Sequence, residues 1–415
     1  MYYYAQNGRA YCALEGGLPL PAAQPPEPSA PVTVLFSREA ERGRTSFVVS
    51  HPRQLTAAQE DVSWLDSRRM AGEAPTLPPE LLERIENRTL RAVNLAHPRG
   101  LAAADVTAPQ AGKKRLHLLA VGDVGGTMLI GLKLLGGDVL HTVGICDLDP
   151  KTTARWEFEM NQVALPGGFD GLPQVEVVEQ AQLFDCDVFV FAASRGVPPV
   201  GQTQGDVRMA QFEANRTLVE RYARMARDAG FRGLFAVVSD PVDPLCKAAL
   251  LSSNRDEAGA YDGKGLLPEQ IQGYGLGVMN ARAGYFAKKD PRFAAYLTQG
   301  RAFGPHGEGL VIADSLVNYN DALSQELTDL TRTANLRLRE LGFKPYVAPA
   351  LSSAALSLLA TVRGQWHYGS VYLGGVYFGA YNRYGPAGQE TEDLALPDAL
   401  YQRLLETQAA LAAII

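Results

Sequence analysis

Short apolar runs alternate with longer amphipathic stretches between about residues 115 and 265. Four runs have the length and composition of buried parallel strands, namely Leu116–Val121, Val139–Cys146, Asp187–Ala193 and Leu234–Ser239. The segments Gly125–Leu135 and Asp206–Ala229 have helical character. Strand–helix alternation of this kind is typical of an α/β fold, here a Rossmann-type doubly wound parallel sheet.

The first 110 residues follow a different pattern. Tyr2–Leu14 alternates around an Asn-Gly dipeptide and predicts a hairpin, and Leu18–Pro31 reads as a proline-rich linker. Val32–Phe36 and Ser46–Ser50 predict a second hairpin, while Pro78–Ala96 has apolar residues at helical spacing. We expect a small α+β accessory module with a packing or oligomerisation role.

After about residue 265 the pattern becomes mixed. Helices are expected near 279–289, 320–341 and 349–362, strands across 367–382, and a last helix from 397. The expected domains are an accessory module (1–110), a dinucleotide-binding Rossmann domain (111–265) and an α+β substrate domain (266–415).

Composition narrows the class of protein. Hydrophobic residues make up 46% and charged residues 20% of the chain, as in globular proteins, and the net charge of −6 disfavours a nucleic-acid partner. The 4 cysteines show no paired spacing, so neither a disulfide framework nor a metal site is expected. No apolar run reaches the roughly 20 residues of a membrane span, and the N-terminus lacks signal-peptide features. We expect a cytoplasmic protein without a membrane partner.

A glycine-containing loop follows the first predicted strand, in the order Ala120-Val-Gly122-Asp-Val-Gly125. Gly122 and Gly125 take the second and third glycine positions of G-x-G-x-x-G, which cradles a pyrophosphate at a helix N-terminus. Ala120 takes the first position, where alanine is tolerated if its φ stays negative. Asp147 ends the second strand and would bind the adenosine ribose, which favours NAD over NADP; Asp149 is the alternative.

Three further motifs follow in order: Ser239-Asp240-Pro-Val-Asp243, Asn280-Ala-Arg282 and Gly304-Pro-His306-Gly-Glu308. His306 lies in a glycine-flanked turn that would expose its ring, and imidazole suits proton transfer near neutral pH. A guanidinium such as that of Arg282 suits two-pronged binding of a carboxylate.

The order and spacing of these motifs resemble the lactate/malate dehydrogenase family over about residues 115–415. The resemblance implies hydride transfer between NADH and a 2-oxo acid, with His306 as acid/base, Arg282 and Asn280 on the substrate, and a homodimer or tetramer. It also implies that Arg208, on the mobile loop, polarises the substrate carbonyl. The implied cofactor contacts are Gly122, Val124, Gly125, Asp147, Ala193, Asn215 and Ser239.

Two positions depart from the family pattern. Met279 stands where the family has the aspartate that orients the histidine, and Asp240 stands where it has an asparagine that bonds the reacting oxygen. Asp240 would replace the missing carboxylate beside His306, or it would bind the cationic group of an amine-bearing substrate. In a third hypothesis the site is catalytically impaired and the protein is a dinucleotide-binding regulator or sensor.

Two further questions concern the substrate. The related NAD- and metal-dependent glycosidases would need metal-ligating Cys and His, for which Cys246 is a candidate, but the His-Gly-Glu turn and the arginine spacing favour a dehydrogenase. The loop Ser194–Val207 is longer than in the family, so the extra arginine of malate enzymes matches either Arg195 or the position of Val197. The sequence therefore leaves lactate, malate and bulkier 2-hydroxy acids open.

Overall fold

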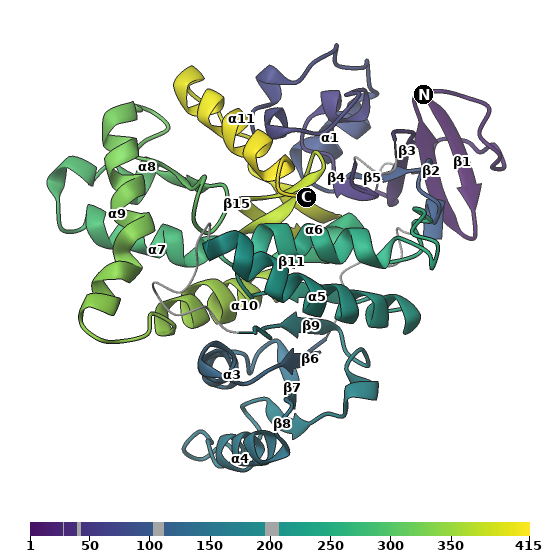
Figure 1. Ribbon diagram of the computed structural model, residues 1–415. Coiled ribbons are helices and arrows are strands. Elements are labelled where there is room, and N and C mark those ends of the chain that lie inside the picture. The colour runs from purple at the N-terminus through teal and green to yellow at the C-terminus, as the bar shows by residue number, and fades with distance from the viewer. Residues whose placement is uncertain (28, 40–42, 103–111, 196–206) are drawn as a thin grey trace.

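The computed structural model describes residues 1–27, 29–39, 43–102, 112–195 and 207–415 (Figure 1). Its largest sheet has nine strands in the order β16-β15-β14-β11-β10-β9-β6-β7-β8. Six are parallel: β6 (Lys114–Leu119), β7 (Leu140–Cys146), β8 (Gln174–Val177), β9 (Val188–Phe191), β10 (Leu234–Val237) and β11 (Ile271–Gly273). Numbered along the chain, these six have the order 3-2-1-4-5-6 of a Rossmann sheet, which confirms the predicted fold class.

Three antiparallel strands extend this sheet beyond β11. They are β14 (His367–Leu373), β15 (Val376–Gly385) and β16 (Gly388–Thr391). A separate two-stranded sheet pairs β12 (Arg301–Phe303) with β13 (Val311–Ala313). The predicted boundary between residues 265 and 266 stays a prediction, because one sheet contains strands from both sides of it.

Helices connect and cover these strands. Those of the parallel part are α3 (Asp123–Leu135), α4 (Pro150–Met160), α5 (Val207–Asp228) and α6 (Val242–Ser253). Those that follow are α7 (Leu276–Ala287), α8 (Tyr296–Gln299), α9 (Asp321–Glu340), a π-helix over Pro349–Leu356, α10 (Ser357–Val362) and α11 (Asp398–Ala412). Helices α7 and α9 pack against each other through a buried cluster that contains Met279 and Leu327, at the left of Figure 1.

The N-terminal part forms a five-stranded sheet in the order β1-β2-β3-β5-β4. Its elements are β1 (Tyr2–Gln6), β2 (Arg9–Ala13), β3 (Val32–Phe36), β4 (Ser46–Val48), β5 (Arg91–Asn94) and helix α1 (Pro79–Glu86). The hairpin predicted at Asn7-Gly8 is present, because β1 pairs antiparallel with β2.

Two predictions for this part are wrong. The strands β3 and β4 do not pair with each other; both pair with β5, which lies between them. The helix predicted for Pro78–Ala96 ends at Glu86, and Arg88, with φ 57°, turns the chain into β5. The apolar residues Leu90 and Val93 therefore belong to the strand and its approach, where sheet pairing overrides the helical spacing.

The N-terminal sheet shares one hydrophobic cluster with the C-terminal part of the chain. Phe47 and Trp64 lie in this cluster together with Phe303, Phe378 and Leu400. In Figure 1 the N-terminal elements (purple) accordingly lie beside α11 and β15 (yellow). The boundary predicted at residues 110 and 111 lies outside the described residues and stays a prediction.

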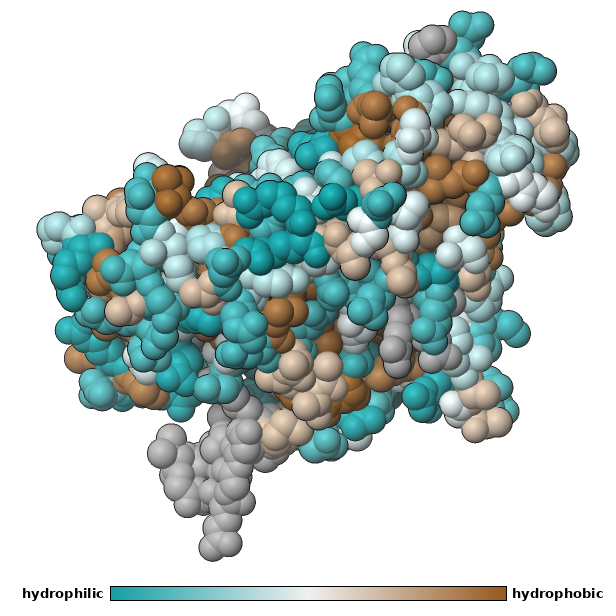
Figure 2. All heavy atoms as spheres, turned by 90° about the horizontal axis from the view of Figure 1, so that it is seen from above, coloured by the Kyte–Doolittle hydropathy of each residue, from teal (hydrophilic) through white to brown (hydrophobic). Residues whose placement is uncertain are grey.

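The surface gives two further observations. On the face shown in Figure 2, hydrophobic residues occur in scattered groups among hydrophilic ones, as is usual for protein surfaces. Within the described ranges, no helix combines the length and apolar character that crossing a bilayer requires.

Candidate active site

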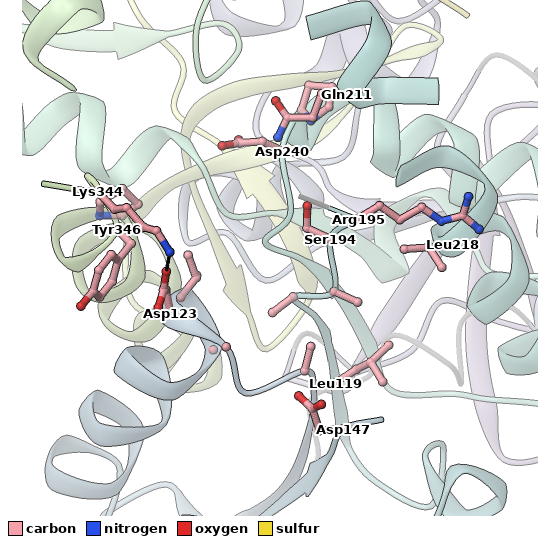
Figure 3. A pocket seen from close by; sticks show the side chains of 18 of the residues that line it. Leu119, Asp123, Asp147, Ser194, Arg195, Gln211, Leu218, Asp240, Lys344 and Tyr346 are labelled. Atoms are coloured by element: carbon pink, nitrogen blue, oxygen red, sulfur yellow. Dashed lines mark hydrogen bonds and ion pairs between the residues drawn. The ribbon is translucent and has the colours of Figure 1, made fainter. Parts of the chain in front are cut away.

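A cavity of about 1940 Å³ opens at the carboxyl ends of the parallel strands (Figure 3). Its lining includes Leu119 at the end of β6, Cys146 at the end of β7 and Ala192 just after β9. The strand order reverses between β6 and β9, and open α/β sheets bind ligands at this switch point. The volume exceeds the roughly 300–1,000 Å³ of typical small-molecule pockets, so the cavity has room for a dinucleotide and a second ligand.

The loop from β6 to α3 forms one wall of this cavity, and its two glycines serve different purposes. Gly122 is the N-cap of α3, and a Cβ placed on it meets no atom within 4 Å, so ligands can approach its backbone closely. A Cβ on Gly125 would lie 2.0 Å from the carbonyl oxygen of Ala120, so this glycine permits close packing of helix against strand. Val124 also lines the cavity.

Ala120 corrects an expectation. Its φ is +73°, in the left-handed region, whereas a negative φ was expected for an alanine at this position. The backbone reverses here between β6 and α3, and the N–H of Ala120 donates to the carbonyl of Cys146 at 2.8 Å. A left-handed conformation costs an L-residue about 1–2 kcal/mol, which glycine avoids.

We therefore expect Ala120→Gly to stabilise the protein. Relief of strain exceeds the about 0.4–1 kcal/mol that glycine costs through the freedom of the unfolded chain, for a net gain of about 0.5–1 kcal/mol. The melting temperature measured by calorimetry should rise, whereas Ala10→Gly, in the regular strand β2, should lower it. An Ala120→Gly protein no more stable than the original would contradict the strain.

The two acidic candidates after β7 have separate positions. Asp147 lines the cavity, and its carboxylate accepts hydrogen bonds from the N–H of Val121 at 2.9 Å and of Asp149 at 3.3 Å. Asp149 instead caps α4, accepting from the N–H of Lys151 and the hydroxyl of Thr152. Of the two carboxylates, that of Asp147 is placed to meet a ligand in the cavity.

The remaining predicted cofactor residues hold the loops after β9 and β10 together. Ala193 lines the cavity, and its carbonyl accepts a hydrogen bond from the hydroxyl of Ser239 at 2.7 Å. The buried amide of Asn215 accepts from the N–H of Arg195 at 2.9 Å and donates to the carbonyl of Asp240 at 2.8 Å. Asn215 and Ser239 therefore fix the backbone that carries the cavity wall.

His306 lies on the turn between β12 and β13, where Gly304 adopts a φ of 79°. It lines the cavity with 15% of its side chain exposed. Its Nδ1 lies 2.9 Å from Oδ1 of Asp240, so the carboxylate accepts the Nδ1–H hydrogen bond. This contact fixes the ring and leaves Nε2 as the nitrogen that can exchange a proton with a ligand.

A second carboxylate, which the sequence did not single out for this role, holds the same turn. Asp243, buried in the first turn of α6, accepts from the backbone N–H of His306 at 3.3 Å and from the hydroxyl of Ser370 at 2.5 Å. Burial raises the pKa of Asp243 to about 6, against the opposing effect of the Ser370 hydrogen bond. Two aspartates of one motif thus contact His306, one through its ring and one through its backbone.

Helix α7 brings Arg282 and Met279 to the cavity. Burial lowers the pKa of the Arg282 guanidinium, and the charge of Asp240 acts in the opposite direction. The Nη1 of Arg282 lies 3.8 Å from the sulfur of Met279, which is 2% exposed. Asn280 is absent from the described lining of the cavity, and its side-chain oxygen accepts a hydrogen bond from the hydroxyl of Tyr296.

The loop predicted to carry the mobile arginine is only partly described. Residues 196–206, including the position of Val197, lie outside the described residues. Arg208 is the second residue of α5, and its side chain also lies outside them. Arg195 lines the cavity, where Figure 3 shows it pointing toward Leu218.

Sequence analysis did not identify three positively charged side chains of the cavity. Arg332 and Arg339 on α9 and Lys344 just after it line the same cavity as His306 and Arg282. The seven-residue interval between the two arginines puts both on one helix face, a signal that the sequence did contain.

Comparisons with known proteins agree with this architecture. The L-lactate dehydrogenase of Mesomycoplasma hyopneumoniae is 25% identical over 203 residues, which is 48% of this chain and 58% of that enzyme. That of Treponema denticola is 24% identical over 208 residues, covering 50% and 59%. The matched region thus spans somewhat more than half the length of these curated relatives. No protein-family model matches the chain.

Solved structures show the same fold over most of their length. A minor L-lactate dehydrogenase from Enterococcus mundtii superposes with a TM-score of 0.59 and 18% identity, covering 73% of this chain and 97% of that one. A malate dehydrogenase from Archaeoglobus fulgidus, solved in complex with NADH, has a TM-score of 0.58 and 18% identity, covering 72% and 98%. The predicted resemblance to the lactate/malate dehydrogenase family is thereby confirmed.

Proposed function

We propose that this relative of the lactate and malate dehydrogenases is an NAD-dependent oxidoreductase that interconverts a 2-oxo acid and a 2-hydroxy acid, with His306 as its acid/base. The observation that carries the proposal is a single cavity with a dinucleotide cradle at one end and His306 and Arg282 at the other. Neither the dinucleotide cradle nor the pair of His306 and Arg282 would indicate a redox reaction alone, but the presence of both in one cavity does.

The residues at the cradle suit NAD. The exposed backbone of Gly122 at the start of α3 would receive the pyrophosphate, and the carboxylate of Asp147 would accept hydrogen bonds from the adenosine ribose. A 2′-phosphate would be repelled by that charge, which favours NAD over NADP. When bound, the reduced cofactor supplies a hydride to the substrate carbonyl carbon.

The residues of the chain itself bind the substrate and supply the proton that the reaction needs. Arg282 binds the substrate carboxylate through its planar guanidinium, and His306 donates a proton from Nε2 to the carbonyl oxygen. Asp240 is a positioning residue, because its contact with Nδ1 orients the ring. We assign Arg208 to polarisation of the carbonyl, as the family resemblance implies.

The contact between Asp240 and His306 also bears on the two alternatives. A cationic group on the substrate is not needed to account for Asp240, because its carboxylate accepts the hydrogen bond from His306. Met279 cannot orient the histidine, but the contact with Asp240 supplies that orientation, so the change at position 279 does not require an impaired, regulatory protein. Both observations favour an active dehydrogenase that acts on a small-molecule substrate. From the family resemblance we also propose that the protein is a homo-oligomer.

The proposal is tested by measuring NADH binding and NADH oxidation with a panel of 2-oxo acids. Gly122→Val should fold normally, since its side chain meets open space, yet it should raise the Kd for NADH at least about 10-fold by blocking the backbone. The matched control is Gly168→Val, at a glycine whose added Cβ would meet only the Cβ of Leu165, at 4.0 Å, and which is not among the described lining residues of the cavity.

The outcomes separate the hypotheses. Turnover of a 2-oxo acid that Gly122→Val impairs and Gly168→Val does not would support the dehydrogenase. NADH binding without turnover of any 2-oxo acid would favour the regulatory protein. Unchanged NADH binding in Gly122→Val would exclude this loop as the cradle.

A further inference from the structure

One wall of the cavity is basic. It consists of Arg332, Arg339 and Lys344, which we call the α9 wall. Asn335, between the two arginines on the same helix face, also lines the cavity. Nothing in the proposed reaction uses these side chains, because the substrate carboxylate is assigned to Arg282.

The α9 wall runs from the reacting end of the cavity, at Arg332, toward the cradle, where Lys344 contacts Asp123 beside Gly122. Helix α9 packs against α7, the helix that carries Arg282. The Nη1 of Arg332 lies 2.6 Å from a carboxylate oxygen of Glu308, which is only two residues beyond His306 in the chain. The Arg332 guanidinium therefore lies on the turn that presents the proposed acid/base.

The present partners of the α9 wall can be exchanged for a ligand. Arg332 contacts Glu308 and Asp329, whose side chains are 75% and 68% exposed. Lys344 contacts Asp123, and Figure 3 shows this pair at the edge of the cavity. Ion pairs this exposed are weak, because water and salt screen both partners, so an anion entering the cavity competes with them readily.

We propose that the α9 wall is an anion subsite and that the substrate carries a second anionic group, bound by Arg332, at the end remote from its reacting carbon. This inference rests on the proposed function, because Arg282 and His306 must fix the other end of the substrate. A carboxylate and a phosphonate both match the planar donors of an arginine. Arg339 and Lys344 add positive potential that draws such an anion inward.

The test compares 2-oxo acids of matched length with and without a second anionic group. Oxaloacetate and 2-oxoglutarate are set against 2-oxobutanoate and 2-oxopentanoate, with 3-phosphonopyruvate as the phosphonate arm. We expect kcat/KM about 10- to 100-fold higher for the dianionic substrates, the range of one hydrogen bond to a charged group.

Arg332→Gln should remove most of this preference, mainly through KM, while the Kd for NADH stays unchanged. Arg337→Gln is the matched control, since Arg337 lies on the same helix, is exposed and is not among the described lining residues. Preference confined to the phosphonate would identify a phosphoryl-type group, and preference shared by the dicarboxylates would identify a carboxylate.

Three results would overturn the subsite, and they are distinguishable. Equal kcat/KM for monoanionic and dianionic acids would refute it and leave the dehydrogenase intact. A raised Kd for NADH in Arg332→Gln, with equal losses for all substrates, would assign the α9 wall to the cofactor. Absence of turnover with every 2-oxo acid would refute the proposed function and the subsite together.

Discussion

Replacing His306 with asparagine is expected to lower kcat/KM for any 2-oxo acid that the protein reduces by about 10²- to 10⁴-fold, the usual contribution of a positioned acid/base. Asparagine keeps a polar side chain of similar reach but carries no proton that it can exchange near neutral pH. NADH should still bind, because the cradle at Gly122 and Asp147 belongs to other elements.

The measurement is steady-state NADH oxidation, combined with equilibrium binding of NADH and a thermal melt. His141→Asn serves as the control, because His141 is an exposed residue of strand β7 that is not among the described residues lining the cavity. Retention of wild-type turnover by His306→Asn would remove this residue from the mechanism, whatever the melt shows.

The parallel sheet was predictable because its signal is local. Each of the predicted strands ending near Val121, Cys146, Ala193 and Ser239 overlaps one observed strand, since a buried parallel strand needs a continuous apolar run. The position of β5 between β3 and β4 was not predictable, because pairing between strands distant in the chain leaves little trace in either strand.

The site likewise has some features that the sequence predicts locally and others that it does not. The sequence predicts where glycines form turns or allow close approach of the backbone, because such positions need glycine whatever the rest of the fold. The loops at Gly122 and Gly304 accordingly lie where the motifs indicated. Ala120 deviates, because the reversal of the backbone between β6 and α3 gives it a φ of +73°, which its own side chain disfavours. Contacts between side chains of separate loops, such as the contact between Asp240 and His306, which lie 66 residues apart, have no local signal, so the sequence can offer them only as a hypothesis.

Replacement of the carboxylate that contacts Nδ1 of His306 should have the second large effect. Asp240→Asn keeps a hydrogen-bonding group at Nδ1 but removes the negative charge of the carboxylate that accepts from the ring. Since a hydrogen bond to a charged group contributes about 1.5–3 kcal/mol, kcat should fall about 10- to 100-fold. The NADH Kd should change little, because the substitution changes the side chain that contacts His306, whereas the cradle is formed by Gly122 and Asp147 on other loops.

Adding Met279→Asp to Asp240→Asn tests whether His306 needs only a carboxylate charge in the cavity, or needs it in the direction from which Asp240 contacts the ring. Met279 lines the same cavity from α7, so an aspartate there would return a carboxylate to the position where the family pattern has one. Its sulfur also lies 3.8 Å from the Arg282 guanidinium, so Met279→Asp alone should engage Arg282 and raise KM. We therefore expect a loss in each single variant and partial recovery of kcat in the double variant.

The double-mutant cycle tests whether Asp240 has taken over the role that the family pattern gives to an aspartate at position 279. If Asp240 has taken over the orienting role, the two substitutions compensate and their effects on kcat are strongly non-additive. Purely additive losses would mean that the contact at Nδ1 does not support proton transfer. In the compensating case, Met279 and Asp240 are two parts of one change relative to the family pattern, and a protein with both residues retains the chemistry that either departure alone would have impaired.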